Sequence, residues 1–181
     1  MPATPNDVLS FWFEELEPAM WWAVDPALDR QIGERFGAVL QSAAAGELFD
    51  WRADARGRLA EIIVLDQFSR NVFRGTPDAF SQDAMGLVLA QEAISQGALD
   101  SLSPVERAFL LLPYMHSESR RIHVEAERLY REFAPEDNYQ FELKHKVIID
   151  RFGRYPHRNQ ILGRESTLEE IEFLKQPGSS F

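Results

Sequence analysis

The chain has 181 residues, enough for one domain with a sizeable core, and its 45% hydrophobic and 27% charged residues are typical of a soluble globular protein. It contains no cysteine, which excludes disulfide bonds, thiol catalysis and cysteine-ligated zinc or iron–sulfur sites. Its formal net charge of −10 argues against general nucleic-acid binding, because such binding depends on neutralising phosphates.

The N-terminal stretch MPATPNDVLSFWFEELEP has no basic region and soon becomes acidic, so it does not have the pattern of a signal peptide. No apolar run approaches the ~20 residues that span a bilayer. We therefore predict a cytoplasmic protein that does not interact with membranes. It should form a single domain over residues 1–181, with a tail that frays over residues 176–181.

Helix start and stop signals follow one another along the chain. Asn6 is the first candidate N-cap, and Asp25 followed by Pro26 is the second. Ser103–Glu106 and Ser166–Glu169 each have the sequence of a capping box. These signals predict helices that begin at about Asn6, run from Pro26 towards Gly46, from about Arg56 to Phe73, from an Asp83 cap to Gly97 and from Pro104, lie at about 119–133 and 138–153, and follow Ser166.

No segment alternates between apolar and polar residues over more than a few positions, so we predict no β-sheet. The connections between the expected helices are short, which favours antiparallel packing of neighbours as stacked hairpins. The predicted fold is all-α, with about eight or nine helices.

The helix expected over residues 56–73 carries two charged residues on an apolar face. Asp66 and Arg70 fall on the same stripe as Leu59 and Ile62, and the opposite side of the helix is also apolar. The two side chains should therefore form a partly desolvated ion pair. Loss of one partner should cost about 3–5 kcal/mol, because the other charge is left alone. The pair either fixes helix packing or belongs to a functional site.

Two histidines also interrupt apolar helical faces. A single histidine in such a position is usually a satisfied core residue, but His116 and His145 lie on different helices, which favours one polar pocket shared with the buried ion pair. Pro113 removes a backbone donor, so its helix should kink or end just before His116. This would leave His116 and Glu118 beside irregular backbone, where functional groups are common.

Residues 151–164, RFGRYPHRNQILGR, contain four arginines, His157 and Asn159, but no acidic residue. Gly153 and Pro156 should break the preceding helix after about Arg154. Guanidinium groups are planar, bidentate donors, so this cluster either binds an external anion or is neutralised by the chain's own carboxylates. The acidic residues available just downstream are Glu165, Glu169, Glu170 and Glu172.

Familiar catalytic and cofactor motifs are missing. The sequence has no P-loop, no GxGxxG, no HExxH and no GxSxG motif. Residues that could serve as metal ligands match no recognised spacing, and the nearby arginines would repel a cation. We therefore predict neither a metal nor a cofactor. The residues considered as possible metal ligands are His116, Glu118, His123, His145 and Asp150.

Three long motifs resemble one protein family. They are DQFSRNVFRGTP from Asp66, PYMHSE from Pro113 and RFGRYPHRNQILGRESTLEEIEFL from Arg151. With VLSFWFEE near the N-terminus, they are similar to an uncharacterised, mostly bacterial family known as domain of unknown function 924. Ser69 departs from the family pattern, which usually has proline there. The resemblance implies an all-α fold similar to the right-handed superhelices of tetratricopeptide-repeat (TPR) proteins, and no established activity, substrate or cofactor.

Three functions fit these observations. The first is a binding scaffold whose arginine- and histidine-lined pocket holds a small anionic ligand or a carboxylate-bearing peptide. The second is a hydrolase- or lyase-type enzyme with a histidine general base and an arginine anion clamp. The third is a protein–protein adaptor whose polar clusters are structural. A histidine that is hydrogen-bonded to a carboxylate and faces a cavity would favour the enzyme over the scaffold.

The hypotheses share one set of candidate residues. In the enzyme, His116 or His145 would be the base, oriented by Glu118 or Asp66, and arginines 154 and 158 would position the substrate. The catalytic candidates are His116, His145 and Glu118. The candidate ligand-binding residues are Asp66, Arg70, Asn71, His116, Glu118, His145, Arg151, Arg154, His157, Arg158 and Asn159.

Overall fold

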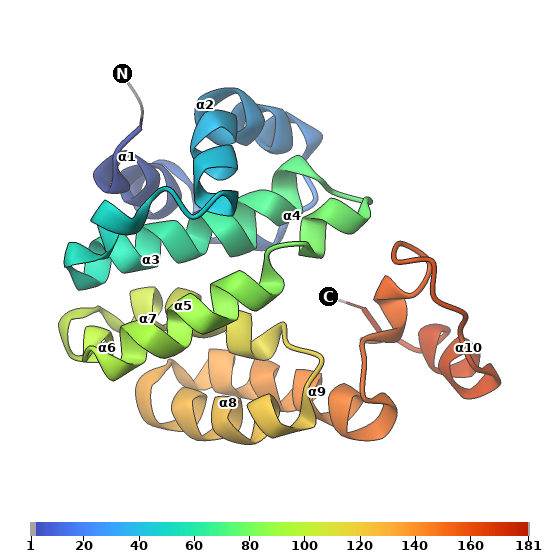
Figure 1. Ribbon diagram of the computed structural model, residues 1–181. Helices are drawn as coiled ribbons and strands as arrows, with labels where there is room; N and C mark the ends of the chain where they lie inside the picture. The colour runs from blue at the N-terminus through green and yellow to red at the C-terminus, as the bar shows by residue number, and fades with distance from the viewer. Residues whose placement is uncertain (1–2, 181) are drawn as a thin grey trace.

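The computed structural model describes residues 3–180, which form stacked helices without a strand (Figure 1). The α-helices are α1 (Pro5–Ser10), α2 (Pro26–Ala44), α3 (Ala55–Ile63), α4 (Ser69–Val72), α5 (Asp83–Ser95), α6 (Ala98–Ser101), α7 (Pro104–Met115), α8 (Arg120–Phe133), α9 (Glu136–Phe152) and α10 (Leu168–Leu174). Short 3₁₀ and π segments are η1 (Phe11–Glu15), η2 (Pro18–Trp22), η3 (Phe49–Ala53), η4 (Val64–Phe68), η5 (Pro77–Phe80) and η6 (Pro156–Arg158). The all-α prediction is confirmed. Phe181, at the end of the tail expected to fray, lies outside the described residues.

Several helices begin and end where the sequence signals place them. Asp25 caps α2 by accepting hydrogen bonds from two backbone N–H groups, and Ser103 caps α7 in a complete capping box. Pro113 lies inside α7, and the helix ends at Met115 with His116 as its C-cap. The predicted break before His116 is confirmed.

Two predicted N-caps are displaced along the chain. Thr4 rather than Asn6 caps α1, and Thr167 rather than Ser166 caps α10. In both helices the acidic residue three positions after the threonine accepts a hydrogen bond from the threonine N–H. The reciprocal arrangement satisfies two backbone donors at once, which decides the position of the cap.

A third displaced start has consequences for the site. Asp83 is predicted as the cap of its helix, but it is the first residue of α5 and Gln82 precedes it. The Asp83 carboxylate forms ion pairs with Arg70 and Arg158 instead. Charge pairing with two buried cations outweighs what a single cap could contribute.

The helix predicted from Arg56 to Phe73 consists of three joined segments, α3, η4 and α4. The middle segment, η4, is π-helical and carries Asp66. Such π segments inside helices are rare and are frequent at functional sites. Helix start and stop signals in the sequence give no warning of this one, because a π segment continues the helix without a cap or a break.

Packing proceeds through the stack in chain order. α1 packs on α3, α2 on η4 and α4, α3 on α5, α5 on α7, α7 on α8, and α8 on α9. One continuous apolar core runs through these elements, from Val8 to Tyr130. No helix within residues 3–180 combines the length and the apolar character needed to cross a membrane. The right-handed, TPR-like superhelix stays a prediction.

The chain after α9 lies beside the stack rather than extending it (Figure 1). Gly153 ends α9 with a φ of 71°, a left-handed conformation that favours glycine, and lets the chain turn. A second, small apolar cluster of Ile148, Ile149 and Tyr155, with Phe152 and Phe173 against it, supports this segment. The arginine-rich residues therefore join the main body largely through polar contacts.

Candidate functional site

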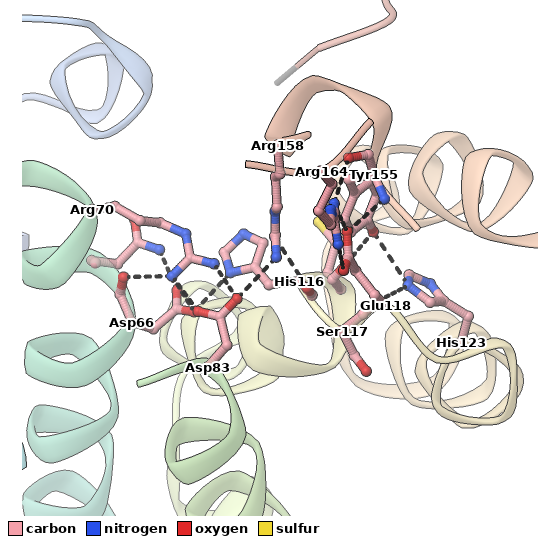
Figure 2. Close-up of polar contacts among 12 residues, drawn as sticks. Asp66, Arg70, Asp83, His116, Ser117, Glu118, His123, Tyr155, Arg158 and Arg164 are labelled. Carbon is pink, nitrogen blue, oxygen red and sulfur yellow. Dashed lines mark hydrogen bonds and ion pairs between the residues drawn. The ribbon is translucent and has the colours of Figure 1, made fainter. Parts of the chain in front are cut away.

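A polar cluster lies where the end of α7 meets η4, α4, the first residue of α5 and residues 151–164, the arginine-rich segment. Figure 2 shows two neighbouring groups of side chains there. The first contains Asp66, Arg70, Asp83, His116 and Arg158. The second is centred on the carboxylate of Glu118.

His116 and Asp66 form the centre of the first group. The ring Nδ1 of His116 lies 2.7 Å from Oδ1 of Asp66. Gln67 donates to the other carboxylate oxygen at 2.5 Å, and Arg70 Nη1 lies 3.1 Å from Oδ1. The Asp66 side chain is 2% exposed, so burial and three polar partners hold its carboxylate in one orientation.

The surroundings set the charges of this pair. Burial works against ionisation of Asp66, but Arg70 and His116 more than offset it and hold the pKa of the Asp66 carboxyl well below its usual range. Burial, and then the positive charge of Arg70, lowers the pKa of His116. A neutral imidazole therefore faces an ionised carboxylate at neutral pH. In that state Nδ1–H donates to Asp66 and the lone pair is on Nε2.

Asp83 connects the two arginines of the first group. Its Oδ2 accepts hydrogen bonds from Arg70 at 3.1 Å and Arg158 at 3.0 Å, and its Oδ1 lies 2.9 Å from Arg70 Nη1. The Arg158 guanidinium is stacked 4.5 Å from the centre of the Phe80 ring and 4.8 Å from that of Tyr155. Two carboxylates and two guanidinium groups therefore balance in charge around His116.

A cavity of about 420 Å³ opens beside this group. The His116 side chain lines it and is 16% exposed, and no hydrogen bond joins its Nε2 to any of residues 3–180. Polar groups of Asp83, Glu118 and Arg158 share the lining with apolar side chains. The apolar lining residues are Pro77, Phe80, Ala84, Leu87 and Leu162.

The second group holds Glu118. Arg164 donates to both carboxylate oxygens, at 2.6 and 2.9 Å, and the backbone N–H of Tyr155 donates to Oε1 at 2.7 Å. Burial opposes ionisation of Glu118, but these bonds outweigh it and lower its pKa. Asp66, not Glu118, is the carboxylate that contacts His116, so Asp66 orients this candidate base.

His145 lies next to the site rather than in it. Its ring centre is 5.8 Å from that of Tyr155, its Nδ1 contacts the Phe141 carbonyl at 2.8 Å, and burial lowers its pKa to about 3. His145 does not line the cavity that His116 lines. The predicted contacts of Asp66 with Arg70 and His116 are therefore observed, whereas His145 is a neighbour of Tyr155 outside the cavity lining.

Other predicted residues point elsewhere. Asn71 donates to Asp29 of α2 at 2.8 Å. Arg151 pairs with Glu169 at 2.8 Å, and Arg154 makes two bonds to Glu170, at 2.6 and 2.8 Å. Acidic residues of the chain thus neutralise these two arginines, as one of the two sequence interpretations expects. The structure directs only Arg158 of the three into the cavity.

His157 and Asn159 support the segment from within. The ring of His157 lies 5.5 Å from that of Tyr155, and burial, followed by the charge of Arg158, lowers its pKa to about 4. Asn159 accepts from Arg164 at 3.0 Å and donates to Ser166 at 3.0 Å. Both side chains shape the turn that presents Arg158 and Arg164.

Several residues of the site could not be identified from the sequence. Asp83 has the signature of a helix cap, Phe80 and Tyr155 look like core aromatics, and Gln67 has no distinguishing pattern. Arg164 belongs to the recognised arginine cluster, but its partner Glu118 is 46 residues away in the chain. Only the packing of distant segments identifies these contacts.

Comparison with known proteins places the chain in a family. A family described as a bacterial protein of unknown function, DUF924, matches residues 8–178. The chain belongs to this family. The fold is similar to that of a protein of unknown function from Agrobacterium tumefaciens whose structure has been solved, with a TM-score of 0.90. The two sequences are 36% identical, and the match covers 94% of this chain and 96% of that chain. No match is found among curated proteins.

Metal chemistry has no evident site in the described part of this DUF924 chain. Within residues 3–180, no group of three or more His, Asp or Glu side chains is arranged to hold an ion. The carboxylates around the cavity are already paired with guanidinium groups. The functional groups that line the cavity include the imidazole of His116, the carboxylates of Asp83 and Glu118, and the guanidinium group of Arg158.

Proposed function

We propose that this protein is a small-molecule enzyme of the hydrolase or lyase type, in which His116 is the general base and Asp66 orients it. The observation that carries the proposal is the 2.7 Å contact between His116 Nδ1 and Asp66, on a histidine that lines a cavity. A base needs a lone pair within reach of the substrate and a partner that fixes its tautomer. His116 is suited to this role, because its Nδ1 contacts Asp66 and its side chain lines the cavity.

The proposed chemistry begins with proton transfer to Nε2 of His116. In a hydrolysis the proton comes from a water molecule as its oxygen attacks the substrate carbon, and it is returned to the leaving group when the bond to that group breaks. In an elimination the proton comes from an acidic C–H group, whose electron pair forms the double bond as the leaving group departs and takes up that proton. The imidazolium that forms is stabilised by the Asp66 carboxylate through Nδ1–H. Burial and the charge of Arg70 keep the ring neutral beforehand, so the base is in its reactive form near neutral pH.

The cavity indicates the kind of substrate. Its volume of about 420 Å³ suits a small molecule, and Phe80, Leu87 and Leu162 would contact an apolar portion. Arg158 Nη1 already donates to Asp83, and its Nη2 donates to the His116 carbonyl. Arg158 is therefore held in place by Asp83 and the His116 carbonyl rather than free to clamp an anion, so the proposed substrate needs no anionic group.

A second candidate is a scaffold that binds a small anion without chemistry. Arg158 favours it, because this buried guanidinium lines the cavity and its Nε has no hydrogen-bond partner within residues 3–180. In that case phosphate or sulfate should raise the melting temperature saturably, beyond a chloride control of equal ionic strength, by mass action. Arg158→Ala should abolish the response.

The first test of the enzyme proposal needs no substrate. Nitrogen-15 NMR of the histidine rings should show His116 at neutral pH with the proton on Nδ1 and the lone pair on Nε2. Diethyl pyrocarbonate, which acylates unprotonated imidazole, should label His116, whereas the fully buried His123 should stay unmodified. A proton on Nε2 of His116, or no labelling there, would contradict the proposal.

The second test measures turnover on p-nitrophenyl esters of increasing acyl length. We expect His116→Gln to lower kcat by ~10²–10⁴-fold, the usual contribution of a general base. Arg151→Gln is the matched control, because Arg151 is exposed and pairs with Glu169 outside the cavity. Equal loss in the two variants would contradict a role for His116 in the chemistry.

A further inference from the structure

The backbone that carries His116 lies at the end of a helix: the His116 N–H still donates to the Leu112 carbonyl at 2.9 Å, but the helix does not continue. α7 ends at Met115, so the carbonyls of its last turn have no partners within the helix. Pro113 has no N–H and so removes one further hydrogen bond from the same helix. The carbonyls of Met115, His116 and Ser117 therefore depend on partners from outside the helix.

Three successive carbonyls at this helix end are held by side chains from other segments. The Tyr155 hydroxyl donates to Met115, Arg158 Nη2 donates to His116 at 3.1 Å, and His123 Nε2 contacts the Ser117 carbonyl at 2.8 Å. Figure 2 shows these groups converging on the end of α7. Two of the three donors, Tyr155 and Arg158, come from the arginine-rich segment.

Tyr155 makes two hydrogen bonds to the residues around His116, one with its backbone and one with its side chain. Its N–H donates to Glu118 Oε1 at 2.7 Å, while its hydroxyl reaches Met115, so it spans His116 from both sides. The side chain is 1% exposed, and its ring packs against the Arg158 guanidinium. The hydroxyl bond to Met115 and the backbone bond to the Glu118 side chain fall on either side of His116 in the chain, so together they restrict this segment.

A buried pair holds Tyr155 in turn. His123 and Glu142 are both 0% exposed and approach to 2.7 Å, and His123 Nε2 lies 3.2 Å from the Tyr155 hydroxyl. Because Nε2 must carry a proton to donate to the Ser117 carbonyl, the same N–H also faces the tyrosine oxygen. The hydroxyl proton is then directed to Met115, which fixes the orientation of the hydrogen bond.

We propose that Tyr155 and Arg158 are positioning residues for His116, because their bonds to the Met115 and His116 carbonyls keep the imidazole Nδ1 on Asp66. Since His116 is the base of the proposed enzyme, this role rests on that function. The same bonds would give residues 151–164 a structural role that does not involve anion binding. This arginine-rich segment would complete the site by packing on the end of α7.

The experiment compares the tautomer of His116 in Tyr155→Phe and Tyr130→Phe, by nitrogen-15 NMR of the histidine rings. Tyr130 is the matched control, because it is fully buried and its hydroxyl also donates to an α7 carbonyl, that of Ala108, at 3.4 Å. Both variants lose one hydroxyl and keep the ring. Thermal unfolding establishes that each is folded.

We expect Tyr155→Phe to shift the ratio of Nδ1–H to Nε2–H forms of His116 about tenfold towards Nε2–H, the factor that corresponds to ~1.4 kcal/mol. Tyr130→Phe should leave the ratio unchanged. Arg158→Lys keeps the charge but cannot bridge Asp83 and the His116 carbonyl in the same way, so it should shift the ratio in the same direction as Tyr155→Phe. If Tyr155→Phe does not fold, the Arg158→Lys variant decides the question.

The outcomes separate the two proposals. A wild-type His116 with its proton on Nε2 would contradict the enzyme itself. A wild-type ring with Nδ1–H, together with no tautomer shift in the folded Tyr155 and Arg158 variants relative to Tyr130→Phe, would overturn the positioning role alone. A merely structural contribution of Tyr155 would lower the melting temperature without moving the tautomer ratio.

Discussion

The Asp83 carboxylate accepts a hydrogen bond from Arg158, 75 residues further along the chain, at 3.0 Å. The same carboxylate contacts Arg70, so the Asp66–Arg70 pair recognised in the sequence is part of a four-charge network. Each charge in this network has more than one partner. Such sharing determines how the network responds when one member is removed.

The first prediction concerns the stability of this network. Asp66→Ala should lower the free energy of unfolding by up to about 3–5 kcal/mol, because Arg70 keeps only Asp83 as a charged partner and His116 loses its acceptor. Adding Arg70→Met should recover part of the loss, since Asp83 keeps Arg158 as its partner. Chemical unfolding of the two single variants and the double variant measures the coupling; strictly additive losses would show that the two residues are independent.

The second prediction separates two arginines that the sequence presents as equivalent. Arg154→Ala should lower the melting temperature clearly with no anion present, because the buried Glu170 carboxylate would lose its two bonds to Arg154 and its charge partner, and this carboxylate also accepts the Thr167 N–H in the capping box of α10. Arg151→Ala should have little effect, since its partner Glu169 is largely exposed. Similar melting temperatures for the two variants, or rescue of Arg154→Ala by phosphate alone, would contradict this assignment.

The third prediction is a loss of stability in mild acid. Burial lowers the pKa of His157 to about 4 and that of His145 to about 3, below the ~6.5 of an exposed histidine. Between these values the unfolded chain binds more protons than the folded one, so the free energy of unfolding falls as the pH falls from about 6.5 to about 4. Urea unfolding at several pH values should show this slope. His157→Asn should reduce it, and an unchanged slope would contradict the role of His157.

The fourth prediction concerns Ser69. Its hydroxyl is fully buried and has no hydrogen-bond partner within residues 3–180, so Ser69→Ala should leave the free energy of unfolding unchanged or raise it by up to about 1 kcal/mol. Ser103→Ala, which removes the cap of α7, should instead cost about 1 kcal/mol. A marked destabilisation by Ser69→Ala would reveal a partner for the hydroxyl, such as a bound water molecule.

The sequence by itself determined the helices and part of the site. Capping boxes, Asp25–Pro26 and the break at Pro113 act over a few residues, so they predict where most helices begin and end. Helical phase likewise places Asp66, Arg70 and His116 on buried faces, because the period of an α-helix is the same in every protein.

Only the tertiary structure decided which of these residues meet. Asp66 reaches His116 across 50 residues and Asp83 reaches Arg158 across 75, and no local signal encodes either distance. The four arginines of residues 151–164 are alike in sequence, yet Arg154 meets Glu170 and Arg158 enters the cavity. Their roles differ because a charged side chain is defined by its neighbours after folding, and packing of the whole chain chooses those neighbours.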